Sequence, residues 1–311
     1  MSKNYFADAE EARTKLTKAQ RKQITDMYKS LAKDIDKEVA SLSQRTNVSS
    51  ILRTQYIKGL SKQVNQELEH MATQQKTSLK EGMTAVSEAV VASNAKMMEG
   101  MGIHLRGVYS YIPRDVVAEV SSGNLYKGRW NLNTAIWKNT KRTQNDINSI
   151  VAKGIAQQKG TYEIAKDLEK YVNPAKRLDW EWSKVYPGTA KVVDYNAQRL
   201  ARTMISHAYQ DSFVRSTKDN PFIEEYEWIA SGGDRMCPIC EERDGKHFSK
   251  LELPLDHPNG MCTFGIVTSY EMTDVADRLA SWVNGADDPE LDKYAKSMGY
   301  PINIVKSSVK M

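Results

Sequence analysis

The sequence predicts a mainly α-helical chain that carries a small α/β module near its C-terminus. Residues 7–45 contain neither glycine nor proline, which favours one long helix. Apolar side chains recur at steps of three and four over much of the first hundred residues, as on one face of a helix. Nearer the C-terminus the pattern changes to short alternating segments, and all three cysteines lie between positions 237 and 262. We therefore expect long helices in a bundle, followed by a compact module around the cysteines.

The first long helix should bury one apolar stripe. Its members are Ile24, Tyr28, Leu31, Ile35, Val39 and Leu42. A stripe of this length needs a helix against it, either in a bundle within the chain or in a coiled coil with a second copy. After a break at residues 46–50, a second stripe runs through Ile57, Leu60, Val64, Leu68 and Met71. A third stripe covers about 78–99 and ends at Gly100 and Gly102.

The methionines at 97–101 fit a flexible core filler at a helix end. An adaptable interface and copper binding by thioether sulfur are the alternatives.

A second group of helices should follow Pro113, which suits the first turn of a helix. Residues 121–128 read as a loop, and helices are expected over 131–157 and 161–172. Thr161 is expected to cap the second of these, with Glu163 in its first turn. A connector with Trp180 and Trp182 precedes a helix over about 189–216, which Asn220 and Pro221 close.

The C-terminal third should contain two strands and two short helices. Residues 225–229 alternate between polar and β-favouring side chains, and residues 262–268 also favour a strand. Short helices are expected at 273–283 and 289–298, before a basic tail with Lys306 and Lys310. These patterns divide the chain into a long-helix region (1–109), a central helical domain (110–220), a Cys/His module (221–272) and short helices with a tail (273–311).

The cysteines and one histidine form a metal-ligand pattern. Cys237 and Cys240 make a C-x2-C knuckle, and His257 and Cys262 follow as H-x4-C. Four soft or borderline ligands match a closed tetrahedral zinc site, which leaves no position for a reactive water. The spacing therefore predicts a structural zinc ion that stabilises a module with few apolar residues. Three buried thiols with a surface histidine are the alternative; an odd cysteine count argues against disulfides.

The same segment resembles a known family. Trp228, then Asp234-Arg-Met-Cys237-Pro-Ile-Cys240, Asp244-Gly245 and His257-Pro258 before Cys262 are similar to the end of the phage head morphogenesis, or minor head protein, family. Gly260 departs from the pattern, because the first of two closing cysteines often stands there. Weaker similarity extends upstream, through Arg129–Trp137, Gly160–Leu168 and Leu200–Thr203, so that the resemblance covers about residues 110–270.

The resemblance implies a low-copy head component that binds the phage portal protein and enters the procapsid during assembly. It also implies a role in genome packaging or DNA ejection, a place in the virion inside the capsid near the portal vertex, and assembly in the host cytoplasm. The major capsid protein or the scaffolding protein is a further expected partner. The contact with the portal is expected on the long N-terminal helices, through the first stripe, and self-association through these helices is the alternative.

Composition excludes some classes of protein. Charged residues make up 27% and hydrophobic residues 40% of the 311 positions, as in a globular protein with one large or two ordinary domains. No apolar run approaches the roughly 18 residues of a membrane span. The net charge of +5 permits non-specific contact with packaged DNA without demanding it.

The sequence favours binding over catalysis. The remaining histidines, at 70, 104, 207 and 247, fit ordinary surface or packing positions. A zinc-containing His-Asn-His-like nuclease would use His257 as general base, but no histidine follows it to bind a catalytic metal. A DNA-binding zinc knuckle is the other alternative, and it lacks a basic helix to enter a groove.

Overall fold

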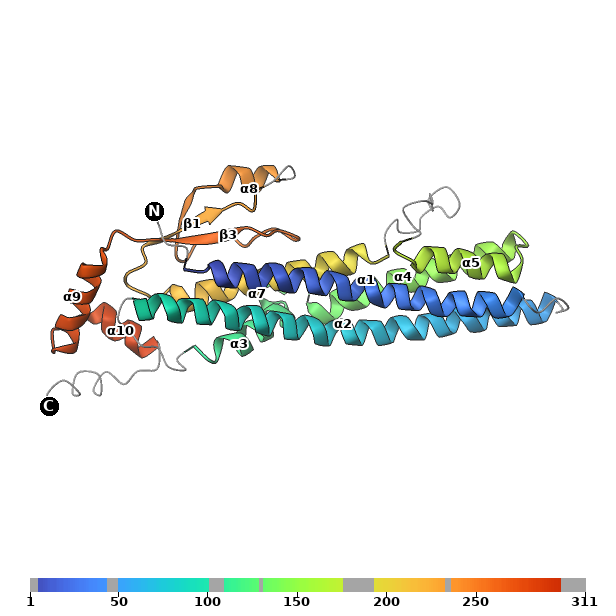
Figure 1. Cartoon of the computed structure of the whole chain (residues 1–311), viewed down its shortest axis with the longest axis horizontal. Helices are drawn as coiled ribbons and strands as arrows, with labels where there is room; N and C mark the ends of the chain where they lie inside the picture. The colour runs from blue at the N-terminus through green and yellow to red at the C-terminus, as the bar shows by residue number, and fades with distance from the viewer. Residues whose placement is uncertain are drawn as a thin grey trace. The chain divides into compact units, whose positions relative to one another are not determined.

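The computed structural model describes residues 5–43, 50–100, 109–128, 131–175, 193–232 and 236–297. Helices dominate these residues, and a three-stranded sheet lies near the C-terminus (Figure 1), which confirms the predicted fold class. The helices are α1 (Ala7–Ser43), α2 (Ser50–Gly100), α3 (Ile112–Ser122), α4 (Leu132–Ala156), α5 (Thr161–Val172), α7 (Tyr195–Thr217), α8 (Pro238–Arg243), α9 (Met272–Val283) and α10 (Pro289–Ser297), with a short 3-10 turn at Asn124–Tyr126. The strands are β1 (Glu225–Ile229), β2 (His247–Ser249) and β3 (Thr263–Val267).

Several sequence expectations fall outside the described residues. They concern the side chain of Leu42, the break at 46–49, the segment 101–104, Trp130, Trp180, Trp182 and the tail residues Lys306 and Lys310. Within the described chain, no helix is long and apolar enough to cross a membrane.

Two details of the helices differ from the expectation. The second and third stripes lie on one continuous helix, α2, because no glycine or proline interrupts residues 71–78 between them. The N-cap of α5 is Gly160, and Thr161 is the first helical residue. The carboxylate of Glu163 accepts a hydrogen bond from the Gly160 backbone N–H at 2.9 Å. A glutamate side chain therefore provides the hydrogen-bond partner of the N-cap residue at the start of this helix.

The chain forms two compact units, each assembled from segments far apart in the sequence. One unit comprises residues 1–16, 81–120 and 203–311, and the other comprises residues 17–80 and 121–202. The helices α1, α2 and α7 each contribute one end to each unit. The units therefore do not follow the four consecutive regions expected from the sequence, whose boundaries stay a prediction.

The unit formed by residues 17–80 and 121–202 buries the first apolar stripe. Ile24, Leu31 and Ile35 are at most 4% exposed, and the side chains of Tyr28 and Val39 are also buried. Polar contacts join α1 to α2, since Gln20 Nε2 donates to the Ser78 carbonyl at 2.9 Å. The stripe is thus covered within the chain, as expected for a bundle.

The other unit is organised around an aromatic core beneath the sheet. The order of its antiparallel strands is β2-β1-β3, and Tyr226 and Trp228 of β1 pair with Ile266 and Phe264 of β3. The ring of Phe213 on α7 lies 5.0 Å from Tyr226 and 5.7 Å from Phe264, measured between ring centroids. Such rings bury large apolar areas. The Cys/His module therefore shares an aromatic core with α7. This core contains more apolar side chains than the sequence suggested.

Candidate metal centre

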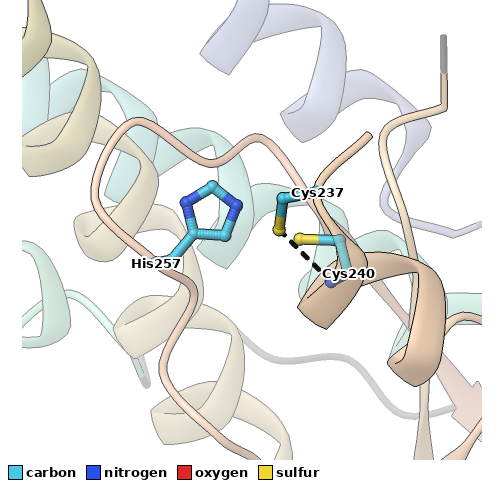
Figure 2. Close-up of side chains that lie close together, drawn as sticks. All are labelled: Cys237, Cys240 and His257. Atoms are coloured by element: carbon cyan, nitrogen blue, oxygen red, sulfur yellow. Dashed lines mark hydrogen bonds between the residues drawn. The ribbon is translucent and has the colours of Figure 1, made fainter. Parts of the chain in front are cut away.

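The candidate ligands come from two short segments of the same unit. Cys237 precedes α8, and Cys240 lies in its first turn. His257 and Cys262 lie in the loop 254–262, which leads into β3. Figure 2 shows the side chains of Cys237, Cys240 and His257 turned toward one another, from the helix on one side and the loop on the other.

The ligand atoms form two overlapping groups. One ligand atom from each of Cys237, Cys240 and His257 lies within 4.8 Å of the other two. Cys240, Asp256 and Cys262 form a second group by the same measure, and the Cys240 and Cys262 sulfurs are 3.4 Å apart. These residues lie close enough to hold a metal ion. All four predicted residues take part, with Cys240 shared, and Asp256 joins them without having been predicted as a site residue.

The start of α8 positions the first two thiols. Pro238 occupies the first turn, where a missing N–H does no harm, and Cys237 caps the helix by accepting from Cys240 N at 3.3 Å. This backbone hydrogen bond lowers the pKa of the Cys237 thiol. Burial raises the pKa of both Cys240 and Cys262. A metal that binds these two thiols must therefore displace protons that the buried site otherwise holds.

His257 is oriented by its own loop. Its Nδ1 lies 3.0 Å from the Pro258 carbonyl oxygen. A carbonyl can only accept, so Nδ1 carries the proton and donates. In a neutral imidazole Nε2 then keeps its lone pair, the arrangement common to histidines that bind metals through Nε2.

Asp256 shapes the ligand loop. Its carboxylate accepts hydrogen bonds from the backbone N–H of His257 at 2.8 Å and of Cys262 at 3.2 Å. The residue is 4% exposed, and its carboxylate fills the space that a side chain at Gly260 would need. A side chain at position 260 would therefore have to displace the Asp256 carboxylate. The one sequence signal for the role was the acid directly before His257.

The polar face of α7 holds the same loop by its backbone. Thr203 Oγ1 accepts from Asn259 N at 2.8 Å, and Ser206 Oγ donates to the Gly260 carbonyl at 2.9 Å. One turn further on, Gln210 donates to the Pro254 carbonyl at 2.7 Å and accepts from Asp256 N at 2.9 Å. The loop is therefore held at several points that do not involve its metal-binding atoms.

His207 belongs to this polar face. Its Nε2 lies 3.0 Å from the Asp256 carbonyl oxygen, and the residue is 2% exposed. Burial lowers the pKa of His207. It packs against the loop as a neutral hydrogen-bond donor, consistent with the expectation of a packing histidine. His247, in contrast, is exposed on β2, where its Nδ1 lies 3.2 Å from a carboxylate oxygen of Glu225.

The donor set fits a soft or borderline divalent ion. Sulfur and imidazole nitrogen suit zinc and similar ions, whereas magnesium and calcium prefer oxygen.

The chain was also compared with known proteins. No family model, no curated protein and no solved structure matches it.

Proposed function

We propose that this chain is a phage minor head protein that binds the portal, enters the procapsid during assembly and assists genome packaging or delivery. It acts by binding and not by catalysis, inside the capsid near the portal vertex. The support is the resemblance of residues 228–262 to that family, together with the convergence of the cysteines and the histidine that carry the resemblance.

We further propose that Cys237, Cys240, His257 and Cys262 hold one structural zinc ion. Two zinc–sulfur bonds of about 2.3 Å at a tetrahedral angle place the sulfurs about 3.8 Å apart. The sulfurs of Cys240 and Cys262 are 3.4 Å apart, so a small outward shift would fit them to one ion. Four protein ligands would leave no position for a water, which favours a structural over a hydrolytic site.

The orientation of His257 supports the structural role over that of a nuclease base. A general base must reach the water or hydroxyl that it deprotonates. The ring of His257 is turned toward two thiols, and its Nδ1 is committed to the Pro258 carbonyl. Metal-dependent cleavage of DNA that disappears in His257→Ala, with zinc retained, would reverse this ranking.

The portal contact is assigned to the central region and not to the stripe on α1. The five members of the stripe whose side chains are described, from Ile24 to Val39, are buried within the chain, so a partner has no access to them. On α4, Trp137 is 53% exposed, and the Lys141 ammonium lies 6.0 Å from its ring centroid. Tryptophan is one of the residues most enriched among the energetically dominant contacts of protein interfaces. We therefore place the contact on the exposed face of α4 around Trp137.

Co-purification of the full chain with the portal protein of the same phage tests both parts. Wild type should co-purify, and Trp137→Ala should weaken binding by about 30-fold, as a cost of about 2 kcal/mol implies. Tyr162→Ala is a matched control, because Tyr162 is also exposed and lies beside Lys166, with 5.7 Å between ammonium and ring. No binding by wild type would reject the portal as partner. Equal binding by Trp137→Ala would reject only the location.

A further inference from the structure

A buried arginine from the start of α1 contacts the metal-ligand loop. Arg13 is 3% exposed. Its Nη1 donates to the carbonyl of Cys262 at 2.7 Å, and its Nη2 donates to the carbonyl of Met261 at 2.9 Å. The guanidinium carbon also lies 4.3 Å from the centroid of the Tyr209 ring. Its charged group is therefore fixed on three sides against α7 and the loop.

Cys262 is held from both ends of its backbone by opposite charges. The Asp256 carboxylate accepts from its N–H at 3.2 Å, and Arg13 donates to its carbonyl at 2.7 Å. The Asp256 carboxylate accepts hydrogen bonds from two backbone donors of the loop and keeps its negative charge beside Cys262. Within the loop Arg13 donates to two neutral carbonyls, so its positive charge lies against the backbone that carries Cys262.

We propose that Arg13 is a positioning residue that supplies the counter-charge of the metal-bound site. A divalent ion with three thiolates and a neutral imidazole carries one net negative charge, the nearby Asp256 carboxylate adds a second, and the single positive charge of Arg13 offsets one of the two. Burying a lone charge is costly, and a fixed opposite charge offsets part of that cost. This inference rests on the proposed metal site and is independent of the proposed portal binding.

Other hydrogen bonds to the loop allow an experiment to distinguish the charge of Arg13 from its hydrogen bonds to the loop. Thr203, Ser206 and Gln210 bind the loop backbone through neutral groups. A substitution at Arg13 alters none of these three residues. A variant that removes one of these neutral bonds therefore serves as a control for the mere loss of a loop contact.

The experiment compares zinc affinity in full-length variants by competition with a chromophoric chelator. Arg13→Met and Arg13→Gln remove the charge, and Arg13→Gln keeps a donor for the carbonyls. Arg13→Lys keeps the charge without the planar fork. We expect both neutral variants to bind zinc about 10- to 100-fold more weakly than wild type, as changes to groups around a metal site do. Arg13→Lys should recover most of the affinity, and Thr203→Val, which removes a neutral loop contact and no charge, should lose less affinity than Arg13→Gln.

A second measurement reads the ligands directly. Cobalt(II) loaded into wild type and Arg13→Gln should give the same thiolate charge-transfer and tetrahedral absorption bands, because the ligands are unchanged. Wild-type affinity in Arg13→Gln, or equal losses in Arg13→Lys and Arg13→Gln, would overturn the counter-charge role while leaving the metal site intact. Failure of wild type to bind zinc or cobalt would overturn the metal site and this inference together.

Discussion

Gly260→Ala should destabilise the unit that carries the metal-ligand loop, through a clash with Asp256. The added Cβ would lie well inside van der Waals contact with both carboxylate oxygens of Asp256. The φ of Gly260 is outside the left-handed region, so the backbone itself accepts alanine without strain. The cost must therefore come from displacing the carboxylate.

The size of the effect follows from what the carboxylate does. It accepts two backbone hydrogen bonds, from His257 N at 2.8 Å and Cys262 N at 3.2 Å. Hydrogen bonds to a charged group each contribute about 1.5–3 kcal/mol. Loss of both would lower the free energy of unfolding by about 3–6 kcal/mol, and partial relaxation of the loop would bring the cost toward the lower figure.

Urea unfolding of wild type and Gly260→Ala measures this cost. Gly59→Ala is the control, since its Cβ would meet nothing within 4 Å on α2 and should stabilise the helix by about 0.5–1 kcal/mol. Repeating Gly260→Ala in an Asp256→Ala background should cost much less, because the space is then open. A loss under 1 kcal/mol, or additive losses in the double variant, would show that the carboxylate does not shape the loop.

Two further predictions concern contacts away from the metal centre. Tyr171→Phe should lower the free energy of unfolding by about 1–3 kcal/mol, because the buried Asp146 carboxylate loses a donor at 2.7 Å; a loss near zero in urea unfolding would contradict this. Hydrogen bonds from Arg278 lower the pKa of Asp288 below 3.8. Wild type should therefore be more stable than Asp288→Asn above that pH. This difference in stability should be lost as pH falls toward the pKa of Asp288 in the folded protein. Unfolding both proteins on either side of pH 3.8 checks the sign, and a gap that widens in acid would refute it.

Local patterns in the sequence predicted much of the secondary structure. The predicted helices 131–157 and 161–172 agree with α4 and α5 to within a residue or so, and the strand 225–229 agrees with β1. In each, the periodicity and the residues that start or end the element lie within the element itself. The spacing of the cysteines and His257 likewise indicated that they would meet.

The contacts that organise the site are long-range, and no local pattern encodes them. Arg13 and Cys262 are 249 positions apart. Strand β2 has only three residues, too few to show alternation, and it exists because residues 225–227 of β1 pair with it. The role of Asp256 depends on Gly260 and on two backbone N–H groups of a turn whose shape the sequence did not reveal.

Long-range contacts also make truncation a poor test of the N-terminal helix. Phe6 packs on Phe213 with 4.8 Å between ring centroids, and Arg13 binds the ligand loop. A truncation of residues 1–45 would therefore damage the module as well as any partner surface. Point substitutions at exposed residues such as Trp137 separate the two effects.

Metal analysis of the purified full-length protein tests the metal centre most directly. Wild type prepared under reducing conditions should contain about one zinc per chain. Cys240→Ser should contain almost none, because Cys240 belongs to both groups of candidate ligands. A folded wild-type protein without bound metal after zinc reconstitution, or a Cys240→Ser variant that keeps a full equivalent, would contradict the assignment of these residues as a zinc site.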